Sequence, residues 1–107
     1  TAATLGVSAD GTGDVLLEAR GAASDVIVNA DVLSDTGHIT LNAGQNVDIN
    51  DVVTTSGAGT VYVLSGNDVD IDAVVSSGNG DILIESGNDI DQTAFIRSFQ
   101  NVHLSRA

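Results

Sequence analysis

The sequence predicts an all-β protein, a right-handed parallel β-solenoid of about four full coils, with three short strands in each coil. Three observations predict this fold class. Apolar residues alternate with polar ones in short runs, glycines with Asn, Asp or Ser separate the runs, and the whole pattern returns every 21 to 24 residues. Alternation with a period of two is typical of strands that bury one face. A fixed period of this length is typical of stacked repeats.

Four units begin at Gly13, Gly37, Gly59 and Gly80, which are 24, 22 and 21 residues apart. The head "LGVSADGT" is similar to the end of an earlier unit, and the tail "NVHLSRA" begins a fifth. We therefore expect residues 1–107 to form a single solenoid segment with both ends within a coil. Because a solenoid needs covers over its end coils, we expect a longer repeat array or an end-to-end assembly.

Each unit contains three apolar pieces, which we expect to be the strands of one coil. The first piece buries alternate residues: Val15/Leu17, Ile39/Leu41, Val61/Val63, Ile82/Ile84 and Val102/Leu104. The second does the same: Val26/Val28, Val47/Ile49, Val69/Ile71 and Ile90/Gln92. The third is a doublet: Val32-Leu33, Val52-Val53, Val74-Val75 and Phe95-Ile96. Helix is disfavoured because β-branched residues dominate the pieces and no 3.6-residue period is present.

Stacking follows from the shortness of these strands. Strands of about four residues do not form stable hairpins alone. Each strand is instead expected to pair with its copy in the next coil, about 4.8 Å away, with the right-handed crossovers that parallel strands prefer. The first unit is longer, because "ARGAASD" stands where later units have "AGQN" or "SGND". We expect this segment to be a protruding turn, or else a binding loop.

Composition narrows the classes of partner. The chain has 15 acidic residues against three arginines, a formal net charge of -12, and no cysteine. Nucleic acid and anionic membrane surfaces are poor partners for such a chain, because both are recognised by basic side chains. The absence of cysteine excludes disulfides and thiol chemistry. We expect no membrane insertion, since no apolar run approaches the roughly 20 residues of a membrane span.

The repeat from Gly13 to Ala107 resembles a known family. Stretches such as "GHITLNAGQNVDIN" and "GTVYVLSGNDVDID" are similar to the repeat region of filamentous-haemagglutinin-like proteins and other giant bacterial surface adhesins. The resemblance implies a non-catalytic, stiff stalk segment on the bacterial cell surface, in contact with flanking repeats and with a host or cell-surface glycan or protein. The alternative is a subunit of an extracellular filament that assembles by end-to-end stacking of copies.

Carboxylates fall into columns, that is, equivalent positions in successive coils. Asp48, Asp70 and Asp91 lie between the buried residues of the second piece and should point outward, about 5 Å apart; we call them the aspartate column. Asp68 and Asp89 precede this piece, and Asp72 follows it. Like charges at this spacing repel by about 1 kcal/mol per pair even in water. The six aspartates therefore predict either calcium sites or a solvated acidic face that discourages aggregation.

Other residues give weaker signals. Gln45, Asn67 and Asn88 form a column of amides that could hydrogen-bond along the axis. His38 and His103 occupy different columns and should face solvent, without metal-ligand spacing. Asp70 and Asp91 are the nearest to a carboxylate pair for glycoside hydrolysis, but we expect no enzyme and no cofactor other than calcium. An outward column is apolar enough for a lateral contact: Leu16, Thr40, Tyr62, Leu83 and His103.

Overall fold

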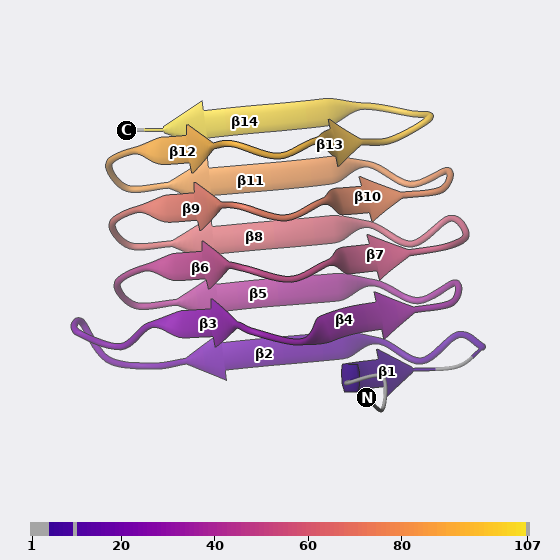
Figure 1. Ribbon diagram of the computed structural model, residues 1–107, viewed down its shortest axis with the longest axis horizontal. Coiled ribbons are helices and arrows are strands. Elements are labelled where there is room, and N and C mark those ends of the chain that lie inside the picture. The colour runs from indigo at the N-terminus through magenta and orange to yellow at the C-terminus, as the bar shows by residue number, and fades with distance from the viewer. Residues whose placement is uncertain (1–4, 10, 107) are drawn as a thin grey trace.

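The computed structural model describes residues 5–9 and 11–106, which form fourteen β-strands and no helix. The strands stack as a ladder, with β1 and β14 at opposite ends of the stack (Figure 1). Every strand pairing is parallel and joins a strand to its counterpart one coil later. Among these residues no helix is long and apolar enough to cross a membrane.

The strands divide into three sheets, one for each piece of the sequence repeat. Sheet A contains the third pieces, β1 (Leu5–Ala9), β4 (Asp31–Ser34), β7 (Val53–Thr55), β10 (Val75–Ser77) and β13 (Ile96–Arg97). Sheet B contains the first pieces, β2 (Val15–Ala19), β5 (Ile39–Ala43), β8 (Val61–Ser65), β11 (Ile82–Ser86) and β14 (Val102–Arg106). Sheet C contains the second pieces, β3 (Val26–Val28), β6 (Val47–Ile49), β9 (Val69–Ile71) and β12 (Ile90–Gln92).

This arrangement confirms the all-β parallel solenoid with three strands in each coil. The stack has about five turns rather than four, because β1 and β14 add parts of a coil beyond the four units. The head of the sequence forms the sheet A strand of the preceding coil, since β1 pairs with β4.

The core consists of aliphatic columns that run along the solenoid axis. In the middle coils the inward residues of all three sheets are wholly buried: Val47, Ile49, Val53, Val61, Val63, Val69, Ile71 and Val75. Their neighbours alternate to the outside, as the burial of β5, β8 and β11 shows. Burial of apolar surface contributes about 25 cal/mol per Å² to stability, so these columns are the main source of cohesion between coils.

One alignment made from the sequence is wrong. Aligning the apolar doublets of the third pieces sets Val32 against Val52, whereas the structure pairs Val32 with Val53. The inward position decides the register, because Val32 and Val53 are both buried while Val52 is only half-buried. Leu33 consequently pairs with Thr54 on the outer side. Apolar character alone could not show which member of each doublet faces the core.

Buried hydroxyl groups close the turns between the sheets. Ser77 Oγ donates to the Gly59 carbonyl at 2.8 Å and accepts from Gly80 N at 3.0 Å. At the next corner, Ser86 Oγ donates to the carbonyls of Asn67 and Asp89, both at 2.8 Å. These serines bind a coil both to its own turn and to the preceding coil. They satisfy backbone groups that would otherwise be buried without a partner.

Glycine at the corners permits close approach of successive coils. A Cβ added at Gly59 would collide with the carbonyl oxygen of Gly37, and one at Gly44 would collide with that of Gly21. The same contact recurs between Gly66 and Gly44 in the next coil. The turn glycines that mark the sequence period are therefore required by the spacing between coils.

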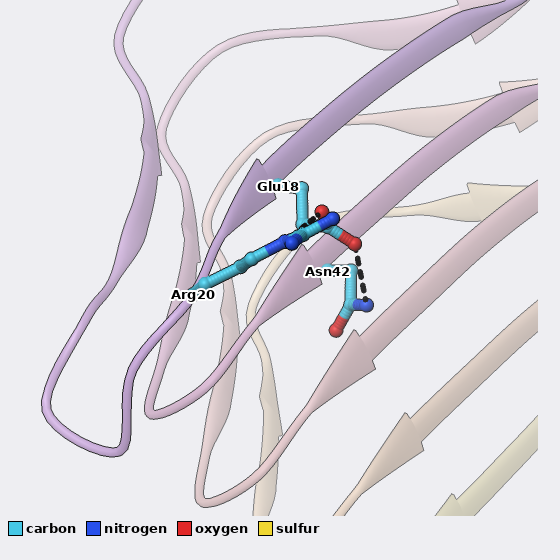
Figure 2. A network of polar contacts seen from close by, with 3 residues as sticks. All are labelled: Glu18, Arg20 and Asn42. Atoms are coloured by element: carbon cyan, nitrogen blue, oxygen red, sulfur yellow. Dashed lines mark hydrogen bonds and ion pairs between the residues drawn. The ribbon is translucent and has the colours of Figure 1, made fainter.

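The long turn of the first unit projects from the stack, at the lower left of Figure 1 between β2 and β3. Gly21 has a φ of 111°, and Ser24 N donates to its carbonyl at 3.1 Å. Figure 2 shows Arg20 beside Glu18, whose Oε1 accepts from Arg20 Nε at 2.7 Å. Glu18 Oε2 lies 3.5 Å from the Asn42 amide of the next coil. This ion pair is exposed, so it orients the start of the turn and adds little stability.

Candidate functional site

The aspartate column lies on the outer side of sheet C, as the sequence predicts. Asp48 pairs with Asp70 across β6 and β9, and Asp70 pairs with Asp91 across β9 and β12. The residues on either side of each aspartate in β6 and β9 are buried valine and isoleucine. Alternation along the strand therefore turns the carboxylates outward, and the stacking of coils brings like charges together.

Three carboxylates gather at the centre of this face. Oxygen atoms of Asp48, Asp70 and Asp72 all lie within 4.8 Å of one another. Asp70 Oδ1 is inaccessible to solvent and has no hydrogen-bond partner among the described residues. Burial raises the pKa of Asp70, and the nearby charges of Asp72, Asp48 and Asp91 raise it further. The geometry concentrates negative charge around one oxygen that no protein donor satisfies.

The other predicted aspartates take different places. Asp68 lines a shallow hollow of about 200 Å³ together with Asp48 and Asp70. Its Oδ1 accepts from the Asn88 amide at 3.0 Å and from Asp89 N at 3.1 Å, so it helps to hold the next turn. Asp89 is exposed on that turn. The structure thus brings Asp48, Asp68, Asp70 and Asp72 to one surface, with Asp91 stacked on Asp70, and leaves Asp89 at the corner.

These residues could hold a hard cation. Calcium takes six to eight oxygen ligands, from carboxylates, amides and water. Asp48, Asp70 and Asp72 would supply the carboxylates, and water would complete the shell, because the face is open to solvent. Thr93 competes for one ligand, since its hydroxyl donates to Asp72 Oδ1 at 2.6 Å. The calcium site and the solvated acidic face both remain predictions for this cluster.

A second acidic pair was missed by the sequence reasoning. Asp31 and Asp51 share a side-chain hydrogen bond that raises the pKa of Asp31 and lowers that of Asp51. Asp51 Oδ1 also accepts from Val52 N at 2.8 Å, which favours its ionised form. The signal was present, because each aspartate directly precedes the third piece of its unit. The residues that precede the third pieces were not compared with one another, although aligning Val32 with Val52 sets Asp31 beside Asp51.

The amide column behaves differently from the prediction. Asn67 Nδ2 donates to Asn46 Oδ1 at 3.0 Å, and Asn88 Nδ2 donates to Asp68 Oδ1 at 3.0 Å. Both bonds run to the adjacent column of the preceding coil, instead of along the predicted column from Asn88 to Asn67 to Gln45. The reason is geometric: the acceptor residues also receive backbone N–H groups from the later coil, so they already point along the axis.

The outer side of sheet B carries the apolar column. Leu16, Thr40, Tyr62 and Leu83 stand in register and line an open hollow of about 640 Å³. Tyr62 Oη donates to Glu85 Oε1 at 2.7 Å, and this bond raises the pKa of the tyrosine.

His38 and His103 are exposed, as expected. His38 Nδ1 accepts from Thr60 N at 2.9 Å. Asp14 Oδ1 accepts from His38 N at 2.8 Å. The side chains of Asp14 and His38 therefore each bind a backbone N–H of the following coil. The accepting Nδ1 fixes the tautomer of the neutral imidazole with its proton on Nε2.

Comparison of the chain with models of known protein families finds no match, and comparisons with curated proteins and with solved structures find none either. The fold and the acidic face are therefore characterised from the residues and coordinates of this chain.

Proposed function

We propose that this chain is a non-catalytic stalk segment of a large bacterial adhesin or surface protein, placed outside the cell. One observation carries the proposal: three parallel sheets continue from coil to coil through the described chain, two with five strands and one with four. Each coil is held to the next by main-chain pairing, buried aliphatic columns and hydroxyl bonds. A structure of this kind is a stiff spacer, because a bend would break all three at once.

The character of the surface supports the same role. Three of the four outward positions between the ends of the sheet C strands are acidic, with Asp48 and Asp70 half-buried and Asp91 exposed, while the fourth is the exposed Ile27. The formal net charge of -12 keeps neighbouring rods apart and protects the sheets from sideways association. Flanking repeats at the coil ends, and a glycan or protein on a host or cell surface, are the partners that a stalk of this class would have.

Force spectroscopy tests the stalk role. A polyprotein that carries this chain between marker domains is stretched along the stack, since the first and last strands, β1 and β14, lie at its opposite ends (Figure 1). A stalk should unfold in discrete events, each releasing one or more coils of roughly 22 residues, or about 75 Å of extended chain per coil. Smooth extension without unfolding events would contradict the proposal.

Two variants make the measurement specific. Val63→Ala removes a wholly buried contact at the centre of sheet B and should lower the unfolding force. Thr40→Ala, on the outer side of the same sheet, is the matched control and should leave the force unchanged. Equal effects of the two substitutions would mean that the aliphatic columns do not resist the load.

An extracellular filament of end-to-end copies is the second candidate. It is favoured by the large apolar side chains that the last coil exposes, Phe95, Phe99, Val102 and Leu104.

A further inference from the structure

The C-terminal coil presents the core columns of the solenoid to solvent. Val102 and Leu104 are 41% and 38% exposed, whereas their counterparts one coil earlier, Ile82 and Ile84, are 1% and 0% exposed. Phe95 and Phe99, in the same coil, are 71% and 84% exposed. Val102 and Leu104 are of the residue types that fill the core of the inner coils, whereas the two phenylalanines have no aromatic counterpart there. Nothing among the described residues covers these four side chains. An uncovered apolar patch of this kind is typical of a contact surface.

The backbone at this end is also unpaired on one side. β12, β13 and β14 are the last strands of sheets C, A and B, and each has one neighbouring strand among those described. Edge strands offer free N–H and C=O groups to another strand. The surface is therefore continuous with an interface already present in the molecule, the parallel contact between one coil and the next.

The opposite end offers a matching hollow. Val7 of β1, Leu17 of β2 and Val28 of β3 line an apolar depression of about 280 Å³ at the N-terminal end of the stack. Leu17 is only partly buried, although its counterpart in the next coil, Leu41, is wholly buried. β1, β2 and β3 are the first described strands of the three sheets, and none of them has a neighbour on this side among the described strands.

The two ends differ in charge. Residues 93–107, which include β13 and β14, contain Arg97 and Arg106 and no Asp or Glu, whereas β12 and the turn before it carry Asp91 and Asp89. Residues 10–31 contain five acidic residues, Asp10, Asp14, Glu18, Asp25 and Asp31, and one basic residue, Arg20, which pairs with Glu18. Stacking the basic end on the acidic end brings opposite charges together. Stacking two like ends would bring like charges together, so complementarity favours a head-to-tail contact.

We propose that the C-terminal coil binds the N-terminal coil of a second copy of this chain, so that copies stack head to tail. β13 pairs in parallel with β1 of the second copy, and β14 pairs with β2 of the second copy. Val102 and Leu104 then continue the columns that hold Val15 and Leu17. Sheet C has one strand fewer than the other two sheets, so β12 keeps a free edge at this joint. The inference deepens the filament alternative and rests on the solenoid acting as a structural rod.

A contact of this type is heterologous, because a different surface is used on each copy. A heterologous contact that does not close into a ring continues as an open filament. The growing assembly would keep the direction of the chain, with every copy oriented alike.

Multi-angle light scattering on the purified chain over a range of concentrations tests the inference. The mass should rise with concentration from 10.8 kDa through its multiples, and the rise should weaken as salt is added, because salt screens the charges at the joint. Leu104→Asp should abolish the growth. Leu16→Asp, which changes an exposed outward residue on sheet B, is the matched control and should leave it intact.

A mixing experiment establishes the polarity. Leu17→Asp alters the N-terminal end only, and Leu104→Asp alters the C-terminal end only. Each variant, once circular dichroism shows that it is folded, should be monomeric alone. An equimolar mixture should stop at the dimer, since one intact end of each kind remains. If Leu17→Asp does not fold, the test uses the other two proteins. A mass that rises with concentration for the wild type and stays at the monomer for Leu104→Asp would then support stacking through the C-terminal coil.

Two results would overturn the inference. One is a wild-type mass of 10.8 kDa at every concentration. The other is association that Leu16→Asp abolishes and Leu104→Asp does not, which would assign the contact to the outer side of sheet B. Neither result bears on the stalk role, because that role is measured by force on a single chain.

Discussion

At the scale of single residues, Asp70 links the packing of the coils to pH. Its pKa is raised above 3.8, first by burial and then by the charges of Asp72, Asp48 and Asp91. A carboxyl whose pKa is higher in the folded than in the unfolded state binds its proton more tightly when folded. The free energy of unfolding therefore increases as the pH falls through the folded pKa, and the gain is complete below the unfolded pKa.

Removing this charge should stabilise the solenoid when no divalent cation is present. We expect Asp70→Asn to raise Tm by about 2–4 °C at pH 7 in EDTA, equivalent to less than about 1 kcal/mol in a domain of this size. The difference from the wild type should shrink as the pH is lowered through the raised pKa of Asp70, because the wild-type carboxyl then gains a proton and loses its charge. Thermal unfolding followed by circular dichroism measures both effects.

Calcium and a second variant complete this test. Asp35→Asn, at an exposed aspartate outside the cluster, is the control and should leave Tm nearly unchanged. If the cluster binds calcium, millimolar calcium should raise the Tm of the wild type and not that of Asp70→Asn. A drop in Tm for Asp70→Asn in EDTA would contradict the repulsion described above.

The sequence predicted part of this cluster. Strand alternation was sufficient to place Asp48, Asp70 and Asp91 in one outward column, because a regular repeat transmits side-chain direction from coil to coil. The closeness of Asp72 to Asp70 was not predictable, since Asp72 follows the strand and its direction depends on the corner. The solvent-inaccessible Asp70 Oδ1 depends on the same local geometry.

At the scale of strands and turns, buried hydroxyl groups at the corners add hydrogen bonds between successive coils. The serines at the end of β10 and of β11 are buried and each makes more than one hydrogen bond. The sequence reasoning treated Ser77 and Ser86 as turn residues. The signal that could have found them is their position two residues beyond a buried residue on the inward side of the strand, where alternation requires burial.

Ser77→Ala should lower the free energy of unfolding by about 1–3 kcal/mol, because it leaves Gly80 N buried without its acceptor. Ser76→Ala is the neighbouring control. Ser76 is half-buried on the outer side, and its hydroxyl contacts only Thr54 Oγ1, at 3.3 Å. It should cost less than about 0.5 kcal/mol. Urea unfolding measures both, and equal losses would show that the corner bonds contribute nothing specific.

Strand existence and parallel pairing followed from periodicity alone, and so did the inward face of sheets B and C, because each depends on alternation and on a regular repeat. The register of β4 against β7 did not follow, since Val52 and Val53 are both apolar and only the core distinguishes them. Amide hydrogen bonds between neighbouring columns, such as that from Asn67 to Asn46, could not be predicted from the sequence either. They depend on how far one column is offset from the next, which only the structure shows.

At the scale of the whole molecule, the solenoid should accept an additional coil. Inserting a second copy of residues 59–79 after Asn79 repeats every column once and should lengthen the stack by about 4.8 Å. We expect the midpoint of chemical unfolding to stay the same or rise, because repeat proteins gain an interface with each added unit. X-ray scattering measures the length.

An insert with the same composition and a scrambled order is the control for this experiment. It should lower the unfolding midpoint and enlarge the molecule irregularly, since it breaks alternation in all three sheets. A fall in the midpoint for the ordered insert as well would mean that the coils are not interchangeable.

The spacing of the coils also sets an electrical property of the rod. The coil from Gly59 to Asn79 contains three aspartates and no basic residue, and each coil adds about 4.8 Å of length. Along that coil the axis carries one negative charge per 1.6 Å or so, close to the roughly 1.7 Å of duplex DNA. A long array of such coils would behave as a polyelectrolyte with its own layer of condensed counterions. The distance between neighbouring rods would then follow the ionic strength of the medium, with a screening length of about 8 Å at 0.15 M salt.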